Sequence, residues 1–339
     1  MANRIAGVVF LWGLGLCDPI LAQPATTPSA QPAQVAATVN GQPIYEHAVR
    51  RGLKRVPESE HARARPEILN YLIDNLLIDQ FLVKQNVRVE AQEVNARMEE
   101  IRKEIKQNGQ DFEKILQSLG LTEAELIEQI TADLRWERYT TERATESALK
   151  DLFEKNPEMF DNTLVRARHI LIPLPKDAQA PTARQNALAE VNRIRKQIED
   201  EVSAGLAKLP ADIEPLQREQ QRVQLLESAF ARLAGEKSAC PSKQDGGDLN
   251  WFPRLGVMAE PFAKTAFALK VHELSQPVET PFGYHLVLVI ARKAGNPIRY
   301  EQVREEVREV YCGKLREELL AQLRPSAQIQ ITPPATSGK

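Results

Sequence analysis

The chain has 339 residues, more than one hydrophobic core usually organises, so two domains with unstructured ends are expected. Its 42% hydrophobic, 27% charged and 6% aromatic residues are typical of a soluble, helix-rich globular protein and exclude a disordered chain or a membrane channel. The 44 Lys and Arg against 46 Asp and Glu give a net charge of -2. Because no excess positive charge is available to neutralise phosphates, nucleic acid is not an expected partner.

Residues 1–22 have the layout of a secretory signal peptide. One basic residue, Arg4, precedes an apolar run that ends at Cys17, and Ala22 offers a small residue for cleavage. The run is too short to span a bilayer, so we predict a periplasmic protein with no stable membrane insertion after cleavage. Lipid attachment at Cys17 and an uncleaved anchor stay as alternatives. Residues 23–34 contain only Pro, Ala, Thr, Ser and Gln and predict a disordered linker.

The next segment predicts a short sheet followed by helices. Residues 37–44 contain a strand, an Asn-Gly turn and a return strand, because Asn and Gly tolerate the positive φ of a tight hairpin. Residues 46–154 carry apolar side chains at helical spacing, which predicts several amphipathic helices. Thr122 and Glu125 form a capping box that begins one of them.

The pattern changes at Thr163. Residues 165–172 predict a central strand, and residues 183–202 and 217–233 predict two helices. Two prolines interrupt the helical pattern between them, so residues 204–220 look like an insertion. This insertion is interpreted either as a spacer or as a surface that binds a partner chain.

The remaining elements return the chain to its beginning. Residues 238–252 are rich in turn formers, residues 261–269 predict a short helix, and residues 283–290 predict a strand rich in β-branched side chains. Residues 300–323 predict a helix and residues 327–331 a strand. We expect this last pair to pack on the N-terminal helices. The fold class is then α+β, with a helical lobe interrupted by a domain that has a small antiparallel sheet.

Six short motifs follow one another between residues 164 and 292. They are Arg168-His169-Ile170-Leu171, Ser238-Ala239-Cys240-Pro241-Ser242, Gly246-Gly247-Asp248-Leu249 with Trp251-Phe252, Met258 with Phe262, Ala266-Phe267-Ala268-Leu269, and Pro281-Phe282-Gly283-Tyr284-His285. In this order they resemble a parvulin-type peptidyl-prolyl cis/trans isomerase. The flanking segments resemble, in their arrangement, the chaperone lobe of secreted SurA- and PrsA-like foldases.

With this resemblance the domain organisation can be written out. The expected parts are a signal peptide (1–22), a linker (23–34), a helical chaperone-like domain (35–162), a parvulin domain (163–294), a C-terminal helix and strand on the N-terminal lobe (295–332), and a tail (333–339).

The reaction that the resemblance implies, rotation about an X-Pro bond, needs few chemical groups. Rotation of an X-Pro amide crosses a barrier of roughly 18–20 kcal/mol that arises from amide resonance. A site that prefers the twisted amide by roughly 4 kcal/mol accelerates rotation about a thousandfold. No metal, cofactor or covalent intermediate is required, and none is expected.

The resemblance also assigns roles to individual residues. Met258, Phe262 and Leu249 would form the proline pocket, with Phe252 supporting it; the alternative is that these side chains belong to an ordinary core.

Three further residues are the predicted catalytic groups. His169 and His285 would lie side by side on neighbouring strands, fix each other's tautomer and polarise the position beside the substrate carbonyl. Cys240 would face the rotating bond as an electrostatic and hydrogen-bonding group, not as a nucleophile. The alternatives are structural support of the pocket for the histidines, and a buried apolar side chain or half of a disulfide for Cys240. Because Cys312 lies in a different predicted lobe, we favour two unbridged cysteines.

The sequence departs from the family pattern at three places. Ala239 stands where an acidic residue often precedes Cys240, Asn250 replaces a glycine, and the stretch from Phe252 to Met258 is one residue longer than usual. The loop of residues 173–182 has only Lys176 as a cation, so selectivity for phosphorylated sites is not expected.

The predicted partners are therefore unfolded or nascent exported polypeptides that contain unmodified X-Pro bonds. The alternative function is a holdase chaperone whose parvulin domain is catalytically weak or inactive and serves as a scaffold. A metal site or hydrolase built from His169, Cys240 and His285 is disfavoured, because no close ligand pair and no orienting Asp or Asn accompanies them.

Overall fold

The computed structural model describes residues 34–174 and 181–333, so the predicted signal peptide, nearly all of the linker, Lys176 and most of the tail lie outside it. The described residues divide into two compact units, 34–148 with 309–333, and 149–308. The sequence pattern places these borders at 162/163 and 294/295. Within the second unit, Phe153 packs against Phe160 and Tyr300, with ring centroids 5.8 and 5.9 Å apart.

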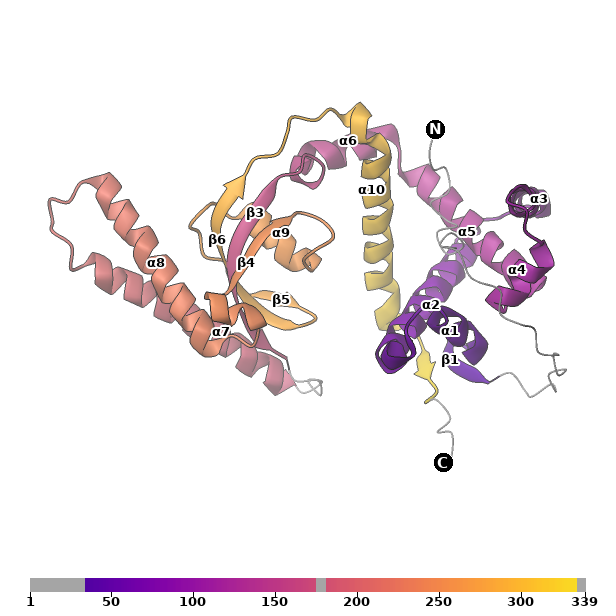
Figure 1. The fold of residues 1–339 in the computed structure, drawn as a ribbon, viewed down its shortest axis with the longest axis horizontal. Coiled ribbons are helices and arrows are strands. Elements are labelled where there is room, and N and C mark those ends of the chain that lie inside the picture. Colours follow the sequence, from indigo (N-terminus) through magenta and orange to yellow (C-terminus); the bar gives the residue numbers. More distant parts are fainter. Residues whose placement is uncertain (1–33, 175–180, 334–339) are drawn as a thin grey trace. The chain divides into compact units, whose positions relative to one another are not determined.

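The first unit combines a three-stranded sheet with amphipathic helices (Figure 1). Its elements are β1 (Val35–Val39), β2 (Gln42–Tyr45), α1 (Glu46–Leu53), α2 (His61–Lys84), α3 (Ala91–Gln107), α4 (Phe112–Leu119), α5 (Glu123–Arg143) and β7 (Ile329–Ile331), while α6 (Glu146–Lys155) and α10 (Tyr300–Leu323) cross its borders. The strand order is β2-β1-β7 and both pairings are antiparallel. Val39 faces Ile329 across the second pairing, which confirms that the C-terminal strand returns to the N-terminal lobe.

The apolar stripe of α2 covers this sheet. Leu69, Ile73 and Leu77 lie on one face of the helix and pack with Ala37 and Val39 of β1. All five residues are at most 3% exposed, so the contact between α2 and the sheet buries apolar surface that stabilises both. The other helices add a second cluster, from α3, α4 and α5, in which Val94, Met98, Ile101, Leu116, Leu126 and Ile130 are buried.

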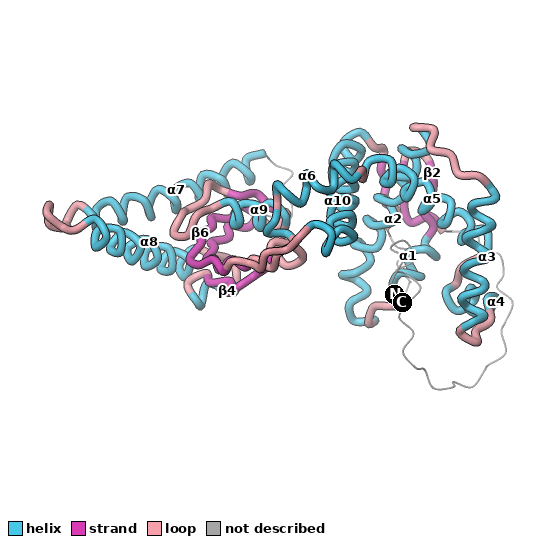
Figure 2. Tube along the Cα trace, turned by 90° about the horizontal axis from the view of Figure 1, so that it is seen from above, coloured by secondary structure: helices cyan, strands magenta, loops and turns pink. Residues whose placement is uncertain are grey.

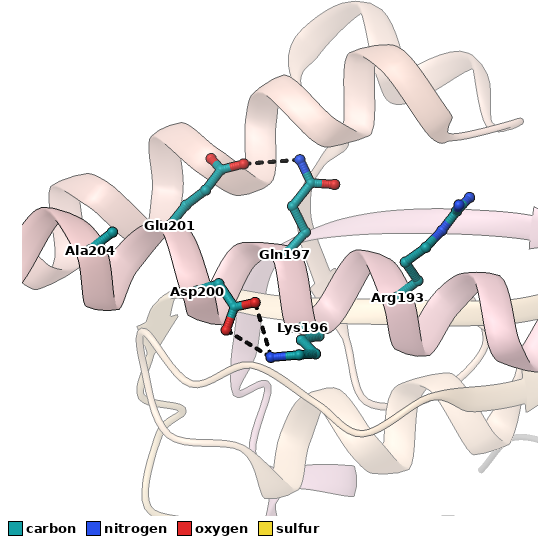
Figure 3. A pocket seen from close by; sticks show the side chains of 6 residues that line it. All are labelled: Arg193, Lys196, Gln197, Asp200, Glu201 and Ala204. Carbon is teal, nitrogen blue, oxygen red and sulfur yellow. Dashed lines mark hydrogen bonds and ion pairs between the residues drawn. The ribbon is translucent and has the colours of Figure 1, made fainter.

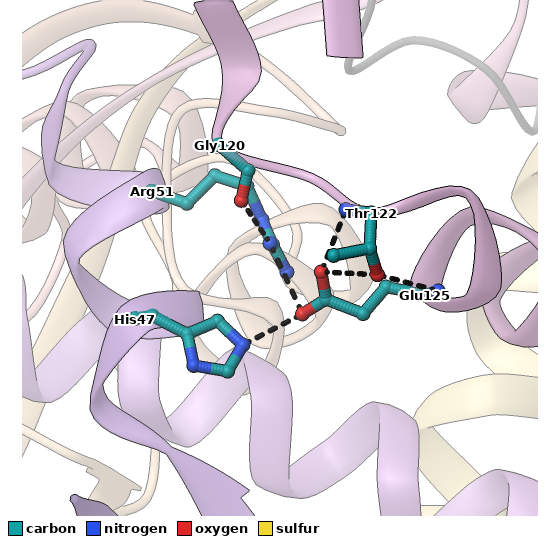
Figure 4. Close-up of polar contacts among 5 residues, drawn as sticks. All are labelled: His47, Arg51, Gly120, Thr122 and Glu125. Atoms are coloured by element: carbon teal, nitrogen blue, oxygen red, sulfur yellow. Dashed lines mark hydrogen bonds and ion pairs between the residues drawn. The ribbon is translucent and has the colours of Figure 1, made fainter. Parts of the chain in front are cut away.

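The predicted capping box at the start of α5 is confirmed, and it also binds α1 (Figure 4). The Thr122 backbone N–H donates to Glu125 Oε2 at 2.9 Å, and the Glu125 N–H donates to Thr122 Oγ1 at 3.2 Å. The other carboxylate oxygen of Glu125 lies 2.6 Å from His47 Nε2, and Arg51 donates to the Gly120 carbonyl at 3.1 Å. One helix N-terminus thereby anchors two side chains of α1.

The second unit is built on a four-stranded antiparallel sheet with strand order β4-β3-β6-β5. Its elements are β3 (Leu164–Pro173), α7 (Pro181–Leu206), α8 (Pro215–Lys237), the 3-10 turn η3 (Pro241–Asp245), β4 (Asp248–Pro253), α9 (Glu260–Ala268), β5 (Val278–Thr280) and β6 (Gly283–Lys293). The α+β class with a small antiparallel sheet is thus confirmed. The edge strands β4 and β5 were not predicted, because both are short and lie in turn-rich sequence.

The two faces of this sheet carry different helices. Leu286 and Leu288 of β6 pack with Ile170 of β3 against α7 and α8, whereas the alternating residues Val287 and Val289 pack against α9. A strand buried on both faces needs an unbroken apolar sequence, as β6 has. Figures 1 and 2 show α7 and α8 side by side as a helical hairpin that extends beyond the sheet. The suspected insertion, 204–220, comprises the tip of this hairpin and the adjoining helix ends.

Candidate active site

The two histidines of the motif lie against each other on the α9 face of the second sheet. His169 on β3 is opposite Val287 of β6, and His285 is opposite Leu171, so the two are diagonal neighbours on one face. Their Nδ1 atoms are 3.1 Å apart and their rings are nearly parallel, at 20°, with centroids separated by 5.4 Å. Each residue is 5% exposed. The predicted juxtaposition of the two imidazoles is therefore present in this structure.

Burial keeps both imidazoles neutral. Burial, and after it the charge of His285, lower the pKa of His169 to about 4. Burial alone lowers the pKa of His285 to about 4. At pH 7 the pair therefore carries no charge, and the contact between the two Nδ1 atoms is a hydrogen bond in which one ring donates and the other accepts.

Thr280, which no sequence motif indicated, contacts His285 at the ring nitrogen that does not face His169. Its Oγ1 donates its one proton to the Gly283 carbonyl at 3.3 Å, accepts from the Phe282 N–H at 3.2 Å and lies 2.7 Å from His285 Nε2. We assign the hydroxyl proton to the Gly283 carbonyl, and with this assignment His285 Nε2 is the donor to Thr280. His285 Nδ1 then accepts from His169 Nδ1. His169 Nε2 is left as an acceptor, buried and without a hydrogen-bond partner among the described residues.

An aromatic wall closes this face of the pair. The ring of Phe262, on α9, meets both imidazoles edge to face, 5.7 Å from His169 and 5.3 Å from His285. Phe252, on β4, lies 6.1 Å from Phe262 and is 1% exposed. Leu249 and Met258 pack, partly buried, against the same cluster. The four residues predicted for the proline pocket thus share one apolar cluster beside the histidines.

Cys240 belongs to the segment 238–240, which is hydrogen-bonded to Leu171 of β3. The Ala239 N–H donates to the Leu171 carbonyl at 2.9 Å, and Ser238 Oγ accepts from the N–H groups of Leu171 at 3.1 Å and Cys240 at 3.2 Å. Cys240 is half-buried and precedes η3 as its N-cap. Neither Cys240 nor Cys312 forms a disulfide in the described part of the chain. These contacts place the backbone of Cys240 beside the strand that carries His169.

A tight loop between η3 and β4 supports the same strand. The Gly247 carbonyl accepts from the His169 N–H at 2.8 Å, and a Cβ at Gly247, where φ is +81°, would lie 2.4 Å from the His169 carbonyl oxygen. Asn250 follows with a φ of 58°, which asparagine tolerates better than most residues. The departure from glycine at Asn250 is therefore compatible with the positive φ at this position.

A partly buried carboxylate, that of Asp248, anchors this loop to β3. Arg166 donates to Asp248 at 2.6 Å. Burial alone would raise the pKa of Asp248, but the hydrogen bonds from Arg166 and from the Asn250 N–H, together with the charges of Arg166 and Arg168, lower it overall. Asp248 is therefore an ionised structural group, not a proton donor for the site.

The hollow in Figure 3 lies elsewhere, on the surface of α7, and none of the predicted site residues lines it. It is lined by Arg193, Lys196, Gln197, Asp200, Glu201 and Ala204. Two hydrogen-bonded pairs occupy it, with 2.9 Å between Lys196 and Asp200 and 3.0 Å between Gln197 and Glu201, so its polar groups already have partners. Within residues 34–174 and 181–333, no group of three His, Cys, Asp or Glu side chains is placed to bind a metal, and none of the helices is long and apolar enough to cross a membrane.

Comparisons with known proteins agree with this architecture. A family model described as the PPIC-type PPIase domain matches residues 203–291, and a model of the SurA-like N-terminal domain matches residues 5–140. The first match includes every predicted site residue except His169, which precedes it on β3. Peptidyl-prolyl cis-trans isomerase NIMA-interacting 1 of Theileria annulata is 33% identical over 136 residues, which are 40% of this chain and 86% of that protein. The chain belongs to the PPIC-type, or parvulin, family of peptidyl-prolyl cis/trans isomerases.

Foldases named PrsA also match this chain, over different lengths. Foldase protein PrsA 2 of Bacillus cereus is 27% identical over 235 residues, 69% of this chain and 64% of the foldase. Foldase protein PrsA of Bacillus subtilis is 39% identical over 94 residues, 27% of this chain and 31% of the foldase. The chain thus spans less than two thirds of either foldase. The crystal structure of a peptidylprolyl isomerase (PrsA) from Bacillus anthracis covers 75% of this chain and 96% of its own, at 24% identity and a TM-score of 0.39.

Proposed function

We propose that this protein is an exported foldase that catalyses rotation of X-Pro bonds in unfolded polypeptides and holds those polypeptides with its helical unit. The observation that carries the isomerase part is the neutral His169–His285 pair seated against Phe262. Apolar side chains that can hold a proline ring lie next to polar groups of fixed tautomer, in the unit that matches the isomerase family.

Catalysis in this proposal is non-covalent. Met258 and Phe262 hold the proline ring, so that the substrate binds best when its amide is twisted and its resonance is partly lost. The uncharged pair keeps the site weakly polar, and a site that solvates the planar amide less well than water does favours the twisted form. Cys240 and His169 are the proposed polar groups beside the rotating bond. His285 acts on His169 through the shared hydrogen bond.

Exposed apolar side chains beside the site favour an extended peptide as the ligand. Phe282, whose backbone N–H binds Thr280, is 67% exposed. Val257, the neighbour of Met258, is 61% exposed. Large apolar side chains left in water at the edge of a binding site often contact a partner. These residues support the proposal that the clients are unfolded chains with apolar residues near proline.

The chaperone part of the proposal rests on the SurA-like match over residues 5–140 and on the similarity to the foldase PrsA 2 of Bacillus cereus. Export, with a periplasmic destination, rests on the signal-peptide pattern of residues 1–22.

A refolding assay tests the enzyme directly. The wild-type protein should accelerate the slow phase of a protein whose refolding is limited by proline isomerisation, and Met258→Ala and His285→Ala should remove that acceleration while the second unit stays folded. If the wild type gives no acceleration but both variants still suppress client aggregation, the holdase alternative is correct and the isomerase proposal is not.

A further inference from the structure

The loop between β4 and α9 carries Met258, and its two ends are joined by an ion pair. Arg254, the residue after β4, donates Nη1 to Glu260 Oε2 and Nη2 to Glu260 Oε1, both at 2.7 Å. Arg254 is only 3% exposed, and Glu260 is the first residue of α9. A bidentate contact of this kind fixes both the distance and the orientation between its partners.

A second contact joins the same two ends. Phe252, two residues before Arg254, and Phe262, two residues after Glu260, have ring centroids 6.1 Å apart. The chain therefore leaves the aromatic cluster at Phe252, passes the ion pair, forms a bend and returns through the ion pair to Phe262. Met258 lies in the bend between these two contacts.

The bend itself has few restraints of its own. Residues 255–259 form no helix or strand, and Gly256 adopts a φ of +83° with nothing within 4 Å of the position of a Cβ. Val257 is 61% exposed. Met is also the most flexible of the large apolar side chains. A flexible side chain on a weakly held bend would sample many positions unless the ends of the bend were fixed.

We propose that Arg254 and Glu260 are positioning residues of the isomerase site, which set the place of Met258 in the proline pocket without contacting the substrate. The proposal rests on the proposed function, since it concerns the same pocket. It also explains how the longer stretch between Phe252 and Met258 is accommodated: the ion pair closes the loop across its base, so the extra residue lengthens the bend and not the pocket.

The energetic reason is the burial of the guanidinium. A charged Arg254 at 3% exposure is tolerated only with a carboxylate beside it. The loop must therefore place Glu260 against Arg254. Neutralising Glu260 leaves the geometry of the side chain but removes the charge that holds Arg254, and the bend is then released.

Glu260→Gln is the primary test variant, and Arg254→Lys is the second, because lysine keeps the charge but has no planar fork to bridge both carboxylate oxygens. Glu201→Gln is the matched control: Glu201 forms a comparable two-oxygen contact with Arg232, at 2.6 and 2.7 Å, on the α7–α8 hairpin. Exchange of an Ala-Leu-Pro-Phe peptide, measured by NMR at several concentrations, gives kcat and KM for each protein.

We expect Glu260→Gln and Arg254→Lys to raise KM about tenfold with less than a threefold change in kcat, and Glu201→Gln to change neither. In a Met258→Ala background, Glu260→Gln should change kcat/KM less than twofold, because the side chain it positions is gone. A general structural role would instead reduce the fraction of folded enzyme, lowering kcat at constant KM and lowering kcat/KM equally in both backgrounds. That result, or wild-type kinetics in both single variants, would overturn the proposal. A wild type with no activity would overturn the proposed function itself.

Discussion

The Nδ1 atoms of His169 and His285 lie 3.1 Å apart although 116 residues separate them in the chain. Two antiparallel strands bring them together, and burial keeps both rings neutral. The pair is part of a chain of hydrogen bonds that continues through Thr280 to the turn before β6. With the Thr280 proton assigned to the Gly283 carbonyl, the direction of this chain follows from the turn, and both rings stay uncharged near neutral pH.

Replacing Thr280 by Val should disturb this chain of hydrogen bonds at constant shape. Without Oγ1, the His285 Nε2–H has no acceptor there, so the tautomers of both histidines are free to exchange. We expect kcat/KM for an X-Pro peptide to fall about tenfold and the 15N shifts of the two rings to move. Thr265→Val is the control, since that hydroxyl donates to the Pro261 carbonyl at an exposed position. Unchanged 15N shifts in Thr280→Val would show that Thr280 does not set the tautomer.

Stability should depend on pH through the same pair. In the folded state both histidines have a pKa of about 4, below the ordinary value of 6.5. Between these values the unfolded chain binds more protons than the folded one, so the free energy of unfolding falls as the pH drops from 6.5 to 4 and does not respond to this pair above 6.5. We expect a loss of several kcal/mol over that window, since each of the two imidazoles contributes up to about 3 kcal/mol.

Denaturant titrations at pH 7, 5.5 and 4.5, followed by the NMR signal of the Trp251 indole in the second unit, measure this loss. In the double variant His169→Gln/His285→Gln, the free energy of unfolding should depend much less on pH. In His61→Gln, in the first unit, the pH dependence should be that of the wild type. A slope that is identical in the wild type and the double variant would show that the pair titrates normally.

Met258→Ala should impair substrate binding more than stability. Met258 is partly buried at the margin of its cluster, so its truncation leaves the core around Phe252 closed. We expect kcat/KM to fall roughly 10- to 100-fold, the effect of about 1.4–2.7 kcal/mol of lost transition-state contact. Leu216→Ala, at a position that is 70% exposed at the start of α8, provides the control and should be neutral. Equal kinetics for the two variants would remove Met258 from the pocket.

Gly247→Ala should destabilise the second unit through one close approach. The added Cβ would lie 2.4 Å from the His169 carbonyl oxygen, in a backbone conformation with φ of +81°. We expect a loss of roughly 2–4 kcal/mol in the free energy of unfolding. Gly256→Ala has nearly the same φ, +83°, but open space around it, so it should cost only about 1 kcal/mol. Similar losses in both variants would mean that strain, and not the contact with His169, dominates.

The sequence predicts the repetitive parts of this fold well. The spacing of apolar residues along the chain predicts strand β6, which has an apolar run, and helices α2, α7 and α8, which have apolar stripes. The alternation around Ile329 and Ile331 predicts a strand at β7, but its pairing with β1 is seen only in the structure. Strands β4 and β5 do not follow from the sequence, because their pairing is imposed by β3 and β6 and not by the propensity of their own few residues.

For the site, the motif order identified the histidines and the residues of the apolar cluster but not their supports. Thr280 acts through three contacts that exist only once β5 pairs with β6. Arg254 is charged, and a sequence pattern gives no reason to bury it; only the position of Glu260 across the loop does. Side chains that act through tertiary partners carry no signature at their own position in the chain.

The most direct test of the central claim is cis/trans exchange at the X-Pro bond of an unphosphorylated peptide, followed by NMR with catalytic amounts of this protein. The account predicts that the wild type accelerates exchange by orders of magnitude over the uncatalysed rate, that the rate is constant from pH 6 to 8 because both histidines stay neutral, and that Met258→Ala removes most of it. An exchange rate in the presence of the folded wild type equal to that of the free peptide would contradict it.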